Sequence, residues 1–357
     1  MEAATSLRQA KVRVRATTLR PWLLVAALAC LVAAILAGVL VGPVPIPAGR
    51  ILEELVNRLP LIRIRSGLSP LDASILVQVR LPRVVLGGLV GATLAMAGAS
   101  YQGVFRNPLA DPFLLGVAGG AGLGATLTVA YLPGRAGWPV DPIPLAAFAG
   151  ALLAVAATYV LGRSGGRART TGTLILAGVA VAAFFTAAQT YVQQQHAETI
   201  REVYSWILGG LETTGWRQVT LLAPYAVVSG VALFLHRRLL DVMSVGDQEV
   251  EGLGLRAARV RVIVVIAATL GTAAAVAVSG LIGFVGIIVP HTVRLLAGPS
   301  YRRILPLSII LGAAFLILAD LVARSAVAPA EIPLGVITAF VGAPFFLVVL
   351  RRTRRVS

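Results

Sequence analysis

The sequence predicts an all-α, polytopic membrane protein with about ten transmembrane helices. Of its 357 residues, 57% are hydrophobic and only 13% are charged, a composition that water-soluble chains of this length do not show. Apolar runs of about 20 residues, each long enough to cross a bilayer, recur along the whole chain. These observations exclude a water-soluble globular protein.

Ten apolar runs are candidate spans. The first follows a basic tail, but it is too long for the apolar core of a signal peptide and no small-residue cleavage site follows it. We therefore expect a basic tail (1–20), one transmembrane domain (21–351) and a second basic tail (352–357). The runs cover residues 21–42, 84–105, 113–132, 143–161, 172–194, 216–235, 260–280, 281–297, 304–325 and 334–350.

The distribution of positive charge predicts the orientation in the membrane. The net charge is +16, and the excess lies in short segments between apolar runs and at the two ends. With both termini inside, the inner segments carry 21 Arg and Lys residues and the outer segments carry 10. This bias places both termini in the cytoplasm. It also argues against nucleic-acid binding, because the charge marks a membrane face instead of a basic patch.

Several enzyme classes are excluded by missing residues. A phosphate-binding P-loop needs a lysine after its glycines, and the only lysine is Lys11 in the N-terminal tail. A zinc protease of the His-Glu-x-x-His type needs paired histidines, whereas His196, His236 and His291 are scattered. We therefore expect a chain that catalyses no reaction, holds no metal and carries no cofactor of its own.

Asp320 is the one clear acidic candidate for ion coupling within the spans. An ionisable group in lipid is costly and is usually retained for function, so a carboxylate here is compatible with an ion-coupled secondary transporter. Arg324 follows at the i,i+4 spacing, and a local ion pair on one helix face explains the same residues. We expect the local pair.

The longest inner segment, residues 236–260, is a candidate docking surface. Apolar residues recur there at roughly helical spacing among acids, which predicts two short amphipathic helices separated near Gly246. Such helices either lie on the membrane surface or bind a soluble partner, and the pattern does not distinguish these roles.

The segment Arg106–Pro112 interrupts two membrane-length apolar runs. Unpaired backbone amides in hydrocarbon cost several kcal/mol each, so an irregular segment at this depth is sheltered inside protein and lines a route or a contact surface. Glycines four residues apart, such as Gly87 with Gly91 and Gly120 with Gly124, predict close approach of neighbouring helix backbones.

Spaced motifs between about residues 22 and 351 resemble the permease subunit of bacterial type II ABC importers, the iron-siderophore, haem and vitamin B12 permease family. The matching residues are Arg80-Leu81-Pro82-Arg83, Gly91-Ala92, Gln102, Arg106-Asn107-Pro108-Leu109-Ala110-Asp111-Pro112, Leu115-Gly116, Gly283-Phe284-Val285-Gly286, Pro290-His291-x-x-Arg294, Ala319-Asp320-x-x-Ala323-Arg324, Glu331-Ile332-Pro333-Leu334-Gly335 and Gly342-Ala343-Pro344-Phe345.

The resemblance implies ten helical spans per subunit and a homodimer in the bacterial inner membrane, surrounded by lipid. It also implies two cytoplasmic ATPase subunits, which bind ATP and Mg, and a periplasmic or lipid-anchored substrate-binding protein. Pairing with a related permease instead of a second copy stays open. No nucleic acid takes part.

The resemblance also assigns roles to individual residues, for which helix packing, turns or arginines at helix ends are the simpler alternatives. Coupling to the ATPase is expected at Leu239, Val242, Val245, Gly246, Asp247, Glu249, Leu253 and Gly254. Docking of the binding protein is expected at Arg80, Arg83 and Arg324. The gates of the translocation path are expected at Asn107, Leu109, Thr171 and Gly172.

The expected function is ATP-driven import of a bulky metal complex, foremost an iron-siderophore. Vitamin B12 (a cobamide) and haem are the alternatives on the same scaffold, although only Tyr191 and His196 lie near the outer mouth as candidate haem contacts. An ion-coupled secondary transporter and a purely structural scaffold are alternatives of other classes.

Overall fold

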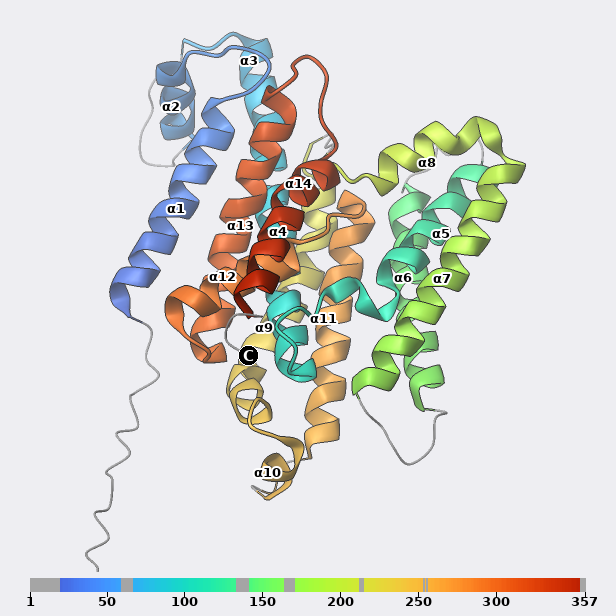
Figure 1. Ribbon diagram of the computed structural model, residues 1–357. Coiled ribbons are helices and arrows are strands. Elements are labelled where there is room, and N and C mark those ends of the chain that lie inside the picture. Colours follow the sequence, from blue (N-terminus) through green and yellow to red (C-terminus); the bar gives the residue numbers. More distant parts are fainter. Residues whose placement is uncertain are drawn as a thin grey trace, which may run out of the picture.

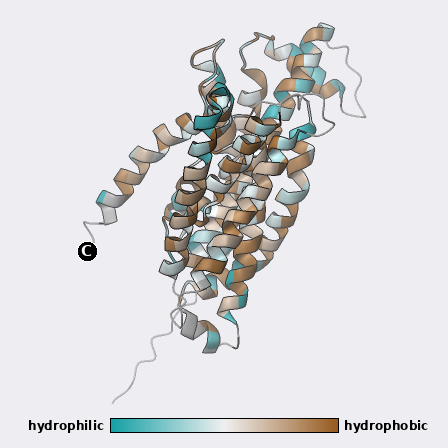
Figure 2. Ribbon diagram, turned by 90° about the vertical axis from the view of Figure 1, so that its right-hand side faces the viewer, coloured by the Kyte–Doolittle hydropathy of each residue, from teal (hydrophilic) through white to brown (hydrophobic). Residues whose placement is uncertain are grey.

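The computed structural model describes residues 20–58, 67–132, 141–163, 171–211, 215–252, 254 and 256–353. Throughout these residues the only regular elements are helices (Figure 1). Apolar residues cover most of the bundle, and the hydrophilic ones concentrate toward its two ends (Figure 2). The predicted all-α class is therefore confirmed. Both predicted basic tails lie almost wholly outside the described residues.

Each predicted span coincides with a helix. In the described part of the chain, seven helical segments are long and apolar enough to cross a membrane, and three apolar helices are shorter. The shorter helices are α5 (Val117–Tyr131), α12 (Val285–Ala297) and α14 (Leu334–Thr353), whose apolar part is Leu334–Val349. The others are α1 (Pro21–Leu40), α4 (Leu81–Phe105), α6 (Pro142–Arg163), α7 (Thr171–Gln195), α9 (Arg217–Met243), α11 (Ala257–Ser279) and α13 (Tyr301–Ser325).

Several short helices were not predicted. Helices α2 (Ala48–Asn57), α3 (Pro70–Ile75) and α8 (Ile200–Ile207) lie at one end of the bundle, which we call the α8 end. The opposite end carries α10 (Asp247–Gly252) and is called the α10 end (Figure 1). Helix α3 continues through the π-helical turn η1 (Leu76–Arg80) into α4, so this span is longer than its apolar run.

The predicted pair of amphipathic helices is only partly correct. A break does occur at Ser244–Gly246, and α10 follows it. The residues before the break, however, are the last turns of α9, which continues without interruption from the bundle to Met243. The reason is that Leu240 and Met243 are fully buried against the bundle, so packing extends the long helix.

Helices α4, α11 and α13 form the centre of the bundle. The apolar windows of α4 and α11 are 78% and 72% buried, whereas that of α7 is only 17% buried. Helices α5, α6 and α7 form a group on one side, and α1 leans against the opposite side (Figure 1).

Glycines bring several of these helices into backbone contact, as their spacing predicts. A Cβ atom on Gly91 would lie 2.2 Å from the carbonyl oxygen of Gly312, and one on Gly120 would lie 2.2 Å from that of Gly150. Gly124 meets the Ala146 carbonyl at the same distance. Helices α4 with α13 and α5 with α6 therefore approach closely because no side chain separates them.

Candidate functional site

An ion-pair cluster lies at the α8 end, centred on Arg83. Its Nε and Nη2 atoms donate to Asp320 at 2.8–3.1 Å. Its Nη1 and Nη2 atoms donate to the two carboxylate oxygens of Glu331 at 2.9 and 2.7 Å. Arg324 completes the cluster, since its Nε atom lies 3.5 Å from Asp320, as the i,i+4 spacing predicts. The cluster therefore joins α4, α13 and the segment that precedes α14.

The Glu331 carboxyl lies in the loop between α13 and α14. The bond donated by Arg83 holds the pKa of this carboxyl below its usual range. The carboxylate is therefore charged at neutral pH.

The other two predicted docking arginines point into the protein. Arg80 donates to the carbonyl oxygens of Val39 and Leu40, at 3.1 and 3.3 Å, and also to that of Val44. Arg324 donates to the Gly38 carbonyl at 2.5 Å. These carbonyls belong to or follow the last turn of α1, where backbone acceptors lack helical partners and cations are favoured. Arg80 and Arg324 therefore cap α1.

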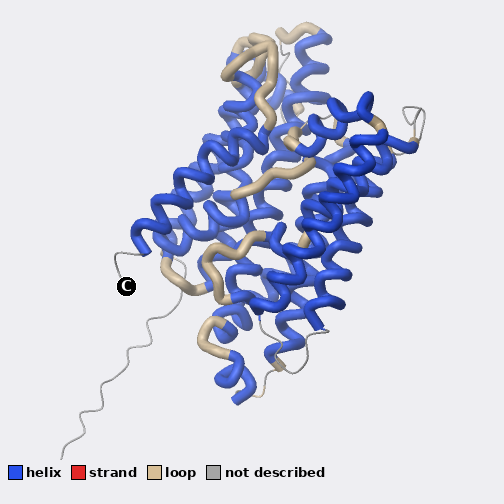
Figure 3. Tube along the Cα trace, turned by 45° about the vertical axis from the view of Figure 1, so that its right-hand side comes forward, coloured by secondary structure: helices blue, strands red, loops and turns tan. Residues whose placement is uncertain are grey.

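The break between α4 and α5 is held by its own side chains. Arg106 adopts a left-handed conformation (φ 49°) and ends α4. The side-chain oxygen of Asn107 accepts from the Leu109 amide at 3.0 Å, and that of Asp111 accepts from the Phe113 amide at 2.7 Å. The predicted sheltering of this segment is only partly correct, because Ala110 and Pro112 are buried whereas Arg106 and Pro108 are exposed. Figure 3 shows loop segments within the bundle as well as at its ends. Asn107 thus stabilises a turn.

The Asp111 carboxyl is perturbed by its surroundings. Burial raises the pKa of this group to about 6, although the bond from the Phe113 amide opposes the shift. The protonated form of this side chain is therefore favoured more than in an exposed aspartate.

Three further gate residues were predicted, of which Thr171 begins α7 and Gly172 is exposed. Contact between α7 and the break occurs further along, where a Cβ atom on Gly178 would lie 2.1 Å from the Leu114 carbonyl. The half-buried Leu109 lies in the break itself. The gate assignments stay predictions.

The predicted coupling residues lie at the α10 end. Leu239 and Val242 pack against the core, whereas Val245 is 69% exposed and Gly246 is buried. Gly254 is left-handed (φ 75°) with open space around it. The side chains of Asp247 and Glu249, and the whole of Leu253, lie outside the described residues.

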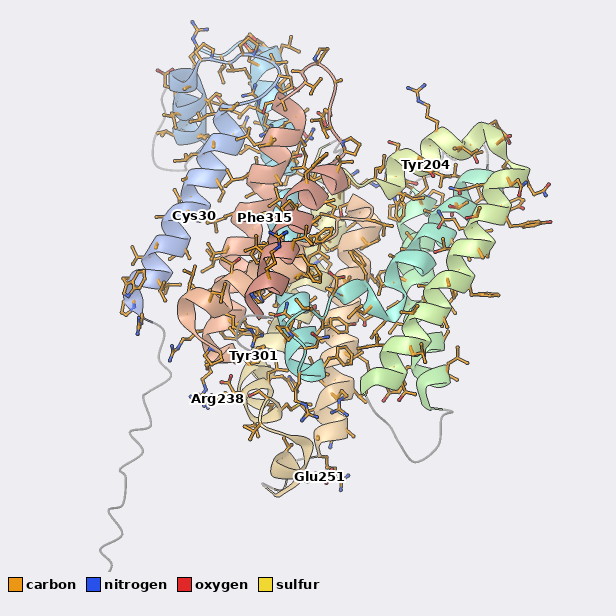
Figure 4. The ribbon with its side chains drawn as sticks, in the orientation of Figure 1. Cys30, Tyr204, Arg238, Glu251, Tyr301 and Phe315 are labelled. Carbon is orange, nitrogen blue, oxygen red and sulfur yellow. The ribbon has the colours of Figure 1, made fainter. Side chains whose placement is uncertain are left out.

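A series of polar side-chain contacts, which the sequence analysis did not predict, connects the α10 end with the break between α4 and α5. Asp241, at the end of α9, accepts from the Tyr301 amide at 2.5 Å and caps α13. The Tyr301 hydroxyl accepts from Arg294 at 2.9 Å, and Arg294 also donates to Gln102 at 3.3 Å. Tyr301 and the α10 residue Glu251 lie toward the same end of the bundle (Figure 4).

Beside the Arg83 cluster, the segment that follows α8 pairs its backbone groups with the end of α11 and the start of α14. The Gly210 amide donates to the Ser279 carbonyl at 2.9 Å, and the Leu334 and Gly335 amides donate to the carbonyls of Gly209 and Leu208 at 3.0 and 2.9 Å. A cavity of about 540 Å³ lies against these segments and is also lined by Arg83, Asp320 and Glu331. This arrangement could not be read from the sequence, because it depends on contacts between distant segments.

A bundle of about ten apolar helices, with irregular backbone sheltered between them and ion pairs at one end, defines a polytopic membrane permease. Residues 30–352 match the model of the FecCD transport family, and the chain belongs to that family. The family resemblance predicted from the motifs is thereby confirmed.

Known relatives and a solved structure support the same family assignment. The chain is 40% identical over 289 residues to the ABC transporter permease protein YvrB of Bacillus subtilis, covering 80% of this chain and 81% of the relative. It is 42% identical to the cobalamin import system permease protein BtuC of Halobacterium salinarum (79% and 75% covered) and 38% identical to the Fe(3+)-citrate import system permease protein YfmE of Bacillus subtilis (78% and 82% covered). An inward-facing structure of a metal-chelate type ABC transporter superposes with a TM-score of 0.79 at 28% identity, covering 93% of this chain and all of that one.

Proposed function

We propose that this chain is the permease subunit of an ATP-driven importer that moves a bulky metal complex, foremost an iron-siderophore, into the cytoplasm. The observation that carries the proposal is the family match over residues 30–352, together with relatives named as importers of ferric citrate and ferric hydroxamate. The chain forms the conduit and catalyses no reaction. ATP and Mg bind to a separate ATPase.

The α10 end faces the cytoplasm and the α8 end faces outward. This orientation is supported by the excess of arginine in the inner segments. Two ATPase subunits bind at the α10 end, and the exposed Val245 and the open Gly254 suit that contact. The binding protein docks at the α8 end, near Arg83.

The functional unit is a homodimer. Helix α7 supports this, because its exposed face combines apolar residues such as Leu176 and Phe184 with the polar Thr186, Thr190 and Gln194. Polar side chains are costly against lipid, so such a face suits a second subunit and the path between the two copies.

Two further readings remain open to experiment. The 42% sequence identity to a cobalamin import permease favours cobalamin as a second candidate cargo. An ion-coupled transporter is disfavoured, because Asp320 accepts bonds from Arg83 and pairs with Arg324, so the carboxylate is already engaged.

The test is reconstitution of the permease in proteoliposomes with its ATPase and binding protein. Uptake of ferric siderophores, cyanocobalamin and haemin is measured with and without ATP. We expect ATP-dependent uptake of a ferric chelate that survives collapse of the proton gradient. Uptake by the permease alone, or uptake that needs only a proton gradient, would refute the proposal.

A further inference from the structure

The Arg83 guanidinium already holds two carboxylates in this structure. A partner that docks through Arg83 therefore meets an occupied site, and this inference rests on the docking role proposed above. All five hydrogen bonds donated by Arg83 to Asp320 and Glu331 are 3.1 Å or shorter. Four of its five N–H groups are engaged, since the Nε–H is shared by both Asp320 oxygens and Nη1 uses one of its two hydrogens. A further carboxylate therefore finds no pair of parallel donors and gains little until one of the two leaves.

Glu331 is the replaceable member of this pair. Its side chain is 41% exposed, whereas that of Asp320 is 4% exposed and lies within α13. Asp320 is also held by Arg324. Displacing Asp320 would take a shared carboxylate away from two buried arginines, a costly change, while Glu331 can move into water. It also borders the cavity, which gives an incoming group room beside Arg83.

We propose that Glu331 is a resident competitor for the docking surface at Arg83, and that this surface accepts an acidic side chain of the binding protein by exchange. The incoming carboxylate takes the two bonds of Arg83 Nη1 and Nη2, and Glu331 moves into solvent. The number of charge-assisted bonds is unchanged, so the exchange is nearly balanced and reversible.

The exchange has a consequence for α14. Glu331 is followed by Ile332, whose amide donates to the Ala323 carbonyl at 2.9 Å. The amides of Leu334 and Gly335 then donate to backbone carbonyls in the segment that follows α8. Once Arg83 releases Glu331, the loop loses its ion-pair anchor to α4. Docking thereby loosens the connection between α13 and α14.

The first experiment measures binding-protein affinity with the full-length permease and its ATPase in lipid nanodiscs. The probe is the binding protein that stimulates ATP hydrolysis by this complex. We expect Glu331→Gln to tighten binding about threefold to fivefold, the range expected when a half-exposed ion pair no longer competes. Glu198→Gln is the matched control, because Glu198 is a strongly exposed acid that contacts His196 and not Arg83. It should leave the affinity unchanged.

A second measurement detects the exchange in the unmodified chain. On addition of the binding protein, amide hydrogen exchange of Ile332 should become faster, although docking interfaces normally slow exchange. Slower exchange there, or a Glu331→Gln variant that binds no tighter than Glu198→Gln, overturns the inference.

An Arg83→Gln variant separates this failure from failure of the docking role. If Arg83→Gln weakens binding while Glu331→Gln has no effect, docking at Arg83 stands and the competitor role falls. If neither variant changes the affinity, docking at Arg83 itself is wrong and both ideas fall, while the uptake experiment still decides the transport function.

Discussion

Gly120→Ala tests whether the α5–α6 contact depends on bare backbone. The added Cβ atom would lie 2.2 Å from the Gly150 carbonyl oxygen and 2.6 Å from the Ala154 Cβ atom, whereas ordinary contacts begin at 3.4 Å. The obstacle is helical backbone, which cannot rotate away as a flexible side chain can. The helices must therefore separate by about 1 Å at this crossing.

The cost follows from the lost contacts. A radial gap of 0.5–1 Å forfeits about a quarter to a half of each dispersion contact across the interface, and overpacking typically costs about 1–3 kcal/mol. We expect a destabilisation of about 2–3 kcal/mol. The assay is thermal unfolding of the purified protein in detergent, followed by size-exclusion chromatography.

Two variants sharpen this test. Gly230→Ala is the matched control, since a Cβ atom there meets only the flexible end of Met96 at 3.6 Å. It should be neutral or slightly stabilising. Gly150→Ala should cost about as much as Gly120→Ala, and the double variant much less than their sum, because one separation relieves both clashes. A Gly120→Ala protein as stable as Gly230→Ala would refute the reasoning.

Three further outcomes are expected. Asp320→Asn should lower stability by about 3 kcal/mol or more in the same thermal assay, because Arg83 and Arg324 lose a buried partner; a loss no larger than that of Glu331→Gln would contradict this. Asp111→Asn removes a carboxyl whose pKa rises from an ordinary 3.8 to about 6 in the folded state, so the stability of the unmodified protein falls as pH rises through this range. The stability of the variant relative to the unmodified protein should therefore be greater at pH 8 than at pH 5. Equal pH profiles would refute it. Gly254→Leu should preserve dimers but lower cargo uptake per ATP hydrolysed, because Gly254 is left-handed (φ 75°) at the proposed coupling surface. Normal uptake per ATP would count against that role.

The local sequence pattern was sufficient to predict the helices of the fold. Apolar runs predicted ten helices because a bilayer-spanning helix must be continuous and apolar, and this property belongs to each segment alone. The Asp320–Arg324 pair was predictable for the same reason, since both residues lie on one helix face. Amphipathic spacing failed at residues 236–243, because burial of Leu240 against distant helices extends α9.

The sequence by itself determined the membrane class, the spans, the family and the local pairs, because composition, length and spacing are properties of the chain in order. Only the tertiary structure decided what the arginines do. Arg80 and Arg324 cap the end of α1, and Arg83 joins Asp320 to Glu331, a partner 248 positions away along the chain. Spacing cannot specify such contacts, since they arise only when packed helices bring distant charges together.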